Sequence, residues 1–317
     1  MKRVPRKFVI GAEIAVAALI AWFAWRSLSA QWDQVSRVAA GVRPDWGRLA
    51  LATGIVLATY LMLVEVWRRM VIAWGEQLGF RDATRIWFVS SLARYVPGKL
   101  WQVGAMGLMA QRVGVSPVAA SGSAIVATVV NLLAGFFVVL LGGSRALDAY
   151  LGGATWIIAV VLAGGVFAAP HLIRKLLTMA GPLLGRQIDI PPIPARAIWL
   201  AFAGSVAAWL LYGVAFYLIT AAVLGTPTGT LDAFITVYTA SYLVGFLVLF
   251  APGGVGFREM TMIPLMQSLG LATAPQALVV AVTSRLWLTL VELGPGLLML
   301  AATRRRVRST PDSSDAN

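Results

Sequence analysis

The sequence contains no cysteine and a single histidine, His171. Without cysteine the chain can form neither a disulfide bond nor a thiolate metal site, and we interpret the histidine as an interfacial residue. The acidic residues are too scattered to form a cluster of metal ligands. The sequence also lacks HExxH, GxSxG and Walker A motifs. We therefore expect no cofactor and no metal, and we expect that the protein is not an enzyme.

Charged residues are scarce as well. They make up 12% of the 317 residues, whereas soluble domains carry about 25%, and 59% of the chain is hydrophobic. The mean hydropathy is +0.80. Several apolar runs are close to the roughly 20 residues that a helix needs to cross a bilayer, and short alternating strands, which are typical of a membrane barrel, are missing. The composition thus predicts an all-α, polytopic integral membrane protein.

About six spanning helices are expected from these runs. They cover residues 8–25, 48–67, 117–142, 154–170, 197–224 and 275–302. Two further apolar segments, 83–112 and 232–270, are interrupted by Pro97-Gly98 and Pro252-Gly253. Proline removes a backbone donor, and glycine tolerates the resulting turn.

Each arm of segment 83–112 has about 14 residues, or about 21 Å of helix, which is too short for a hydrocarbon core of about 30 Å. We therefore predict that both broken segments are re-entrant hairpins, which must be buried in protein or line a cavity. An alternative remains for the second one, because residues 232–250 are long enough to cross fully.

Basic residues indicate the orientation. With the N-terminus inside, sixteen of the 26 lysines and arginines fall in the N-terminal tail, 68–85, 171–196 and the C-terminal tail. This asymmetry predicts that both termini are cytoplasmic. The Ala- and Val-rich, Lys-poor composition is consistent with a bacterial protein, which we expect in the inner membrane. The net charge of +13 then reflects loops beside anionic lipids, and we expect no binding to nucleic acid.

The expected elements repeat. Residues 1–145 and 146–305 each contain two spans, a broken hairpin and a third span, and residues 306–317 form a tail. An odd number of crossings in each half turns the second half upside down, which is the inverted repeat of many secondary transporters. Each break is followed by a glycine and by a proline that opens the next span.

Charged residues at membrane depth are candidates for function. Arg94 and Lys99 flank the first break, where a guanidinium and an ammonium group suit a phosphate. The alternative is that both side chains reach to the interface. Trp101 and Gln102, just beyond the turn, are candidates for lining the same path.

The second break, APGGVGFRE, places Arg258 and Glu259 after three glycines, Gly253, Gly254 and Gly256. Successive backbone N–H groups there can form an anion cradle. The alternative is an ion pair of Arg258 with Glu259 or Glu292.

Two charges in the last predicted span, Arg285 and Glu292, are seven residues apart and share one helix face, so we expect them in a polar network that faces the hairpins. Glu65 is either part of such coupling, with Glu259 and Glu292 as candidates for proton binding, or a local partner of Arg68 and Arg69.

The segments RYVPGKLWQ at 94–102 and PGGVGFRE at 252–259 resemble the flippase-like membrane family that includes the transmembrane half of lysylphosphatidylglycerol synthases. The similarity extends over residues 8–302. It implies a role in moving a polar lipid between leaflets, without the aminoacyl-transferase half of those synthases. The matching positions that it implies as site residues are Arg94, Tyr95, Pro97, Gly98, Lys99, Pro252, Gly253, Gly254, Gly256, Arg258 and Glu259.

We therefore expect a lipid flippase that works by alternating access on an anionic phospholipid headgroup, with membrane lipids as its partners. Two alternatives remain open: a membrane component of an enzyme that modifies phospholipid or polyprenyl phosphate, and a scaffold that binds a lipid-synthesis enzyme. A homo-oligomer is compatible with the sequence.

Overall fold

The computed structural model describes residue 22 and residues 43–95, 100–143, 193–247 and 256–308, the last seven of these by their backbone alone. The expected spans 8–25 and 154–170 fall almost entirely outside the described residues. So do Pro97, Gly98 and Lys99 in the first turn and Pro252, Gly253 and Gly254 in the second.

Every regular element among the described residues is a helix. Four of the helices are long and apolar enough to cross a membrane: α2 (Trp46–Ala73), α5 (Pro117–Gly142), α8 (Ala195–Leu224) and α11 (Ala274–Arg308, of which Ala274–Ala301 qualifies). They correspond to the predicted spans 48–67, 117–142, 197–224 and 275–302. The all-α membrane class is therefore confirmed, and the total number of spans and the domain boundaries remain predictions.

In each segment with Pro-Gly, the described residues form separate helices on either side of that pair. The first consists of α3 (Phe80–Ser91), the short 3₁₀ helix η1 (Leu92–Tyr95) and α4 (Leu100–Gln111), and the second of α9 (Leu231–Leu247) and α10 (Phe257–Ser268). The 12 residues of α3 and of α4 correspond to about 18 Å, and the 17 residues of α9 to about 26 Å. All three are shorter than a hydrocarbon core of about 30 Å.

The order of a long helix, a broken segment and a long helix occurs twice, as α2–α3–α4–α5 and as α8–α9–α10–α11. Both broken segments end in the same turn. The Val115 N–H donates to the Ala110 carbonyl and the Leu271 N–H to the Met266 carbonyl, each across five residues. The glycine before each donor, Gly114 or Gly270, has a positive φ, as the Schellman motif requires. This match supports a repeat, and its inverted orientation remains a prediction.

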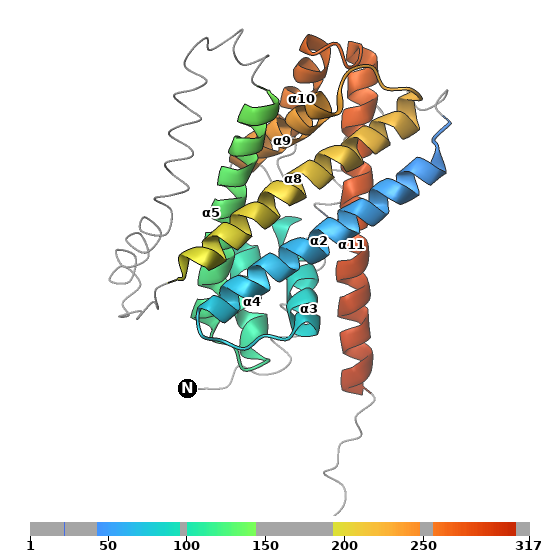
Figure 1. The fold of residues 1–317 in the computed structure, drawn as a ribbon. Helices are drawn as coiled ribbons and strands as arrows, with labels where there is room; N and C mark the ends of the chain where they lie inside the picture. Colours follow the sequence, from blue (N-terminus) through green and yellow to red (C-terminus); the bar gives the residue numbers. More distant parts are fainter. Residues whose placement is uncertain (1–21, 23–42, 96–99, 144–192, 248–255, 309–317) are drawn as a thin grey trace, which may run out of the picture.

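The two broken segments lie toward opposite ends of the long helices. In Figure 1, α3 and α4 lie toward one end, and α9 and α10 lie toward the other. Helix α8 packs against α2, α5 and α9, whereas α11 contacts α3 from the first broken segment and α10 from the second. Both broken segments thus contact α11, and both also contact α5, through α4 and α9.

Glycines allow the closest helix contacts. A Cβ at Gly213 in α8 would lie 2.6 Å from the Cα of Ile235 in α9, and one at Gly296 in α11 would lie 2.7 Å from the carbonyl oxygen of Phe88 in α3. Distances below 3 Å to backbone cannot be relieved by moving a side chain. These two glycines therefore fix how closely α9 approaches α8, and how closely α11 approaches α3.

We predict that Gly213→Ala destabilises the protein by about 1–3 kcal/mol or more, because the added methyl group overpacks the α8–α9 contact. The matched control is Gly54→Ala on the exposed face of α2, where a Cβ meets nothing within 4 Å and alanine favours the helix by up to about 1 kcal/mol. Thermal unfolding of both variants in detergent micelles checks this. Equal midpoints for the two variants would contradict the packing described.

Candidate functional site

Helix α11 carries two charged side chains toward the broken segments. Arg285 and Glu292 are seven residues apart, or about 10 Å along the helix axis, and lie on one face. Arg285 is buried, and only 12% of the Glu292 side chain is exposed. Each pairs with a residue of a different broken segment, so the predicted polar network on this helix exists in the structure.

The second broken segment contributes Glu259. Its Oε1 accepts a hydrogen bond of 2.7 Å from Nη1 of Arg285, and the two side chains are 14% and 10% exposed. Its Oε2 accepts from the backbone N–H of Gly256, 2.8 Å away, at the start of α10. Gly256 has a φ of 86°, a conformation that side chains disfavour. One carboxylate therefore fixes the first turn of α10 and joins it to α11.

Arg94 is the contribution of the first broken segment. Its Nη1 forms an ion pair with Oε1 of Glu292 at 2.5 Å. Its Nε donates to Oε1 of Gln102 at 3.4 Å, so the same guanidinium also connects η1 to α4 across the break. The close approach of α11 to α3 at Gly296, one turn beyond Glu292, brings these partners together.

Among the described residues, Arg258 forms neither of the ion pairs that the sequence suggested, with Glu259 or with Glu292. Its guanidinium lies against two tyrosine rings: its Cζ is 4.9 Å from the centroid of Tyr238 and 5.8 Å from that of Tyr242. Arg258 is only 9% exposed, and within the described part of the chain its Nη2 has no hydrogen-bond partner. Because interaction with a ring face does not use the in-plane N–H donors of a guanidinium, Nη2 is available to bind an anion.

Tyrosines fill the space around these charges. Tyr60 contacts Tyr212 at 6.1 Å between ring centroids, Tyr212 stacks on Tyr238 at 5.7 Å, and Tyr238 stacks on Tyr242 at 6.4 Å. We name the residues Arg94, Arg258, Glu259, Arg285 and Glu292, with these four tyrosines, the central cluster.

The tyrosines were the part of the site that sequence reasoning missed. Their hydropathy is unremarkable for a membrane helix, where tyrosine and tryptophan often belong to an interfacial aromatic belt. The structure instead packs Trp209 and Tyr212 against neighbouring helices. Trp209 is 2% exposed and donates to the Asn131 carbonyl oxygen at 2.8 Å, and Tyr212 belongs to the central cluster. The spacing of Tyr238 and Tyr242, four residues apart and therefore on one helix face, was the available signal.

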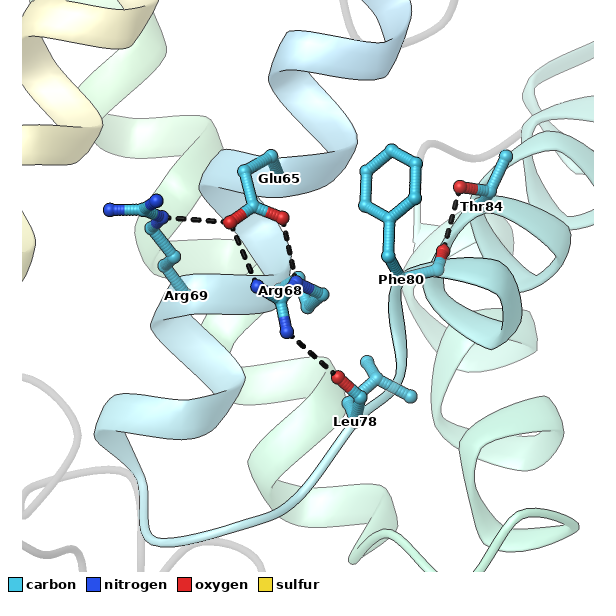
Figure 2. Close-up of polar contacts among 6 residues, drawn as sticks. All are labelled: Glu65, Arg68, Arg69, Leu78, Phe80 and Thr84. Atoms are coloured by element: carbon cyan, nitrogen blue, oxygen red, sulfur yellow. Dashed lines mark hydrogen bonds and ion pairs between the residues drawn. The ribbon is translucent and has the colours of Figure 1, made fainter.

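Glu65 has local partners. Its carboxylate binds Nε of Arg68 at 2.6 Å and Nε of Arg69 at 2.8 Å, and Arg68 also donates to the Leu78 carbonyl oxygen at 3.1 Å. Figure 2 shows this group at the end of α2 and the turn that leads to α3. The local-pair alternative for Glu65 is therefore confirmed. Through Arg68, this group holds the turn before the first broken segment.

The remaining predicted site residues divide into two groups. Trp101 is 60% exposed on α4, so its side chain is not enclosed with the central cluster. Tyr95 is placed at the end of η1 by its backbone, and its side chain lies outside the described residues, as do Pro97, Gly98, Lys99, Pro252, Gly253 and Gly254. Their predicted roles stay predictions.

An apolar groove of about 340 Å³ lies between α2 and α11. It is lined by Thr53, Leu57, Trp287, Leu290, Val291 and Pro295. Trp287 Nε1 donates to Thr53 Oγ1 at 2.9 Å, which satisfies the two polar groups of the lining. Val291 precedes Glu292 directly, so this groove lies at the same level along α11 as the Glu292 side of the central cluster.

These features define a polytopic α-helical membrane protein in which charges from two broken segments meet on one shared helix. Residues 10–296 match the family model described as the lysylphosphatidylglycerol synthase TM region. Because the match covers nearly the whole chain, the protein belongs to this family, as the two sequence motifs predicted. No curated protein matches the chain.

We predict that Arg285→Met destabilises the protein by about 3–5 kcal/mol, because it leaves the Glu259 carboxylate buried without its cation. The control is Arg69→Met. Arg69 is 55% exposed, and its partner Glu65 keeps Arg68, so a loss of about 1 kcal/mol or less is expected. Denaturant unfolding in micelles measures both.

The double variant Glu259→Gln/Arg285→Met completes the comparison. A glutamine oxygen retains an acceptor for the Gly256 N–H, and no charge is left unpaired, so we expect most of the lost stability to return. A double variant as unstable as Arg285→Met alone would contradict the pairing.

Proposed function

We propose that this protein moves a polar phospholipid between the two leaflets of a bacterial inner membrane by alternating access, and does not catalyse a reaction on it. Two findings support the proposal: the chain belongs to a family of lipid-related membrane domains, and a buried cluster of charges joins two broken helical segments. Secondary transporters place substrate sites at such breaks.

The observation that carries the proposal is Arg258. A guanidinium that is 9% exposed, with an Nη2 that no described residue binds, is costly unless a ligand completes it. Arginine matches the paired oxygens of phosphate. In this proposal the headgroup phosphate binds Arg258 at the second break, beside the first turn of α10.

The acyl chains remain in apolar surroundings throughout. The groove between α2 and α11 offers an apolar lining at the level of Glu292 along the helix, which suits a hydrocarbon chain while the headgroup is in the central cluster. A lipid would then enter from the side of the protein, with its polar and apolar parts matched to separate regions.

The two ion pairs of α11 allow the two broken segments to open one after the other. A phosphate that approaches either broken segment competes with a carboxylate for its arginine, at Arg94–Glu292 on one side and at Arg285–Glu259 on the other. Releasing one pair frees one segment from α11 while the other pair holds. Each segment thereby opens in turn around a fixed α11.

A second candidate function rests on the family description itself, which names the membrane region of a synthase. In that case the protein holds a lipid for a separate lipid-modifying enzyme and does not carry it across. Lipid binding without leaflet exchange distinguishes this function from transport.

We predict that purified protein in liposomes exchanges a labelled phospholipid between leaflets, and that Arg258→Ala lowers the rate by about 10- to 100-fold, the effect expected for losing a charged hydrogen bond. Anionic, zwitterionic and cationic lipids are compared, with exchange followed by quenching of the label in the outer leaflet.

The control variant is Arg85→Ala on the exposed face of α3, which is expected to exchange lipid at the wild-type rate. If the wild type exchanges no lipid of the panel while it remains folded, the transport proposal fails. If Arg258→Ala exchanges as fast as Arg85→Ala, the central cluster is not the path of the headgroup.

A further inference from the structure

We infer that Glu292 is a proton-binding site, and that it takes up a proton whenever a lipid phosphate displaces the Arg94 guanidinium from it. Lipid movement is then coupled to proton movement. This inference rests on the proposed function for its lipid, and it adds the ion that powers the cycle. The sequence left three carboxylates as candidates, and their partners in the structure distinguish Glu292 from Glu65 and Glu259.

The surroundings of Glu65 make it unsuitable for this role. Two arginines bind its carboxylate, Arg68 at 2.6 Å and Arg69 at 2.8 Å. The Arg69 side chain is 55% exposed, so water reaches this group at the end of α2. Displacing one arginine leaves the other in place, and Glu65 therefore stays ionised whether or not a lipid is bound.

Glu259 keeps a partner even when its cation leaves. Its Oε1 binds Arg285, and its Oε2 accepts from the Gly256 N–H at 2.8 Å. A hydrogen bond from a backbone N–H favours the ionised form of a carboxylate. The Arg285 side chain is also only 10% exposed, against 30% for Arg94, so an arriving phosphate reaches Arg94 more readily. The pair that a lipid opens first is therefore Arg94–Glu292.

The environment of Glu292 determines what happens when that pair opens. Its side chain is 12% exposed, and it interacts electrostatically with Tyr60, Tyr212 and Tyr238. Phenol groups are neutral at ordinary pH, so they supply dipoles and no counter-charge. An ionised carboxylate without a counter-charge is far more costly to bury than a carboxylic acid. Glu292 therefore takes up a proton when Arg94 leaves it.

The other guanidinium groups of the central cluster do not replace Arg94. Arg285 is paired with Glu259, and Arg258 lies against tyrosine rings and binds the phosphate in the proposed function. The titratable and charged groups around Glu292, taken by element from the described residues, are Arg94 of η1, Tyr60 of α2, Tyr212 of α8, Tyr238 of α9, Arg258 and Glu259 of α10, and Arg285 of α11.

The proton balances the charge of the arriving phosphate. Arg94 exchanges one anionic partner, the Glu292 carboxylate, for another, the phosphate, and the proton neutralises the carboxylate that is left behind. It comes from the water on the side to which the first broken segment opens. When the phosphate leaves on the other side, Arg94 pairs with Glu292 again and the proton is released there. Lipid and proton thus move in the same direction, so a proton gradient can power the movement of the lipid.

The test counts the protons taken up when phosphatidylglycerol binds to the full chain in neutral detergent micelles. This lipid is the probe because its headgroup has no group that titrates near neutral pH. Binding enthalpies measured by calorimetry in buffers of different ionisation enthalpy give the number of protons as a slope. At about pH 6, where an ordinary glutamate is ionised, we expect an uptake of about one proton per lipid.

The affinity should also fall as the pH rises, by up to about tenfold per pH unit, because binding that consumes a proton is favoured at low pH. Binding without proton uptake, or no binding at any pH, overturns the inference. This measurement on the wild type needs no variant to fold.

Two substitutions remove the proton uptake for different reasons. Glu292→Gln leaves no group to accept the proton, and Arg94→Gln leaves Glu292 without this cation before the lipid arrives. Glu65→Gln is the control, which we expect to take up as many protons as the wild type. Thermal unfolding in micelles checks that each variant is folded. A folded Glu292→Gln or Arg94→Gln variant that still takes up a proton, or a folded Glu65→Gln variant that takes up none, overturns the inference.

Leaflet exchange in liposomes separates this inference from the transport proposal. A pH difference is imposed across the liposome membrane, and exchange of the labelled lipid is followed in both directions. Proton uptake on binding without any exchange supports Glu292 as the proton site and overturns transport. Exchange whose rate does not depend on the imposed pH difference supports transport and overturns the coupling.

Discussion

Charges in a membrane protein must be compensated inside the protein, because the surrounding lipid supplies neither water nor counterions. Here, α11 meets that requirement for both broken segments at once. Arg285 pairs with Glu259, and Glu292 pairs with Arg94. A broken helix at membrane depth also leaves backbone groups without partners, and Glu259 satisfies one of these at Gly256. The Glu259 carboxylate therefore both stabilises the start of α10 and connects it to α11.

Much of this arrangement was predictable from the sequence. Prolines next to glycines in apolar segments have few structural explanations, so the two breaks followed from local chemistry. The spacing of Arg285 and Glu292 placed them on one face of α11, and their scarcity in an apolar helix indicated that the face is internal. The turn glycines Gly114 and Gly270 were recognisable by position, and the structure shows the same backbone hydrogen bonds at both.

The partners of the charges were not predictable, because pairing depends on how the helices pack. Arg258 and Glu259 are neighbours in sequence, which favoured a local pair. Successive residues of a helix point about 100° apart, and the first turn of α10 directs Glu259 to Arg285 and Arg258 to Tyr238. The glycines that bring α9 against α8 and α11 against α3 set these directions, and a helical glycine in a membrane sequence has no distinct signal of its own.

The different surroundings of the arginines explain how one cluster can both hold the fold and bind a ligand. A guanidinium with a carboxylate partner is satisfied and acts as a structural link, as Arg285 does. Arg258, which lies against the rings of Tyr238 and Tyr242, is held in position while its Nη2 has no hydrogen-bond partner among the described residues. Replacing the tyrosines by carboxylates would satisfy Arg258 and remove its reason to bind an anion, whereas replacing them by aliphatic side chains would leave the charge too costly to bury. The aromatic surroundings are intermediate between these extremes, so they allow a cation to stay buried and still accept a headgroup.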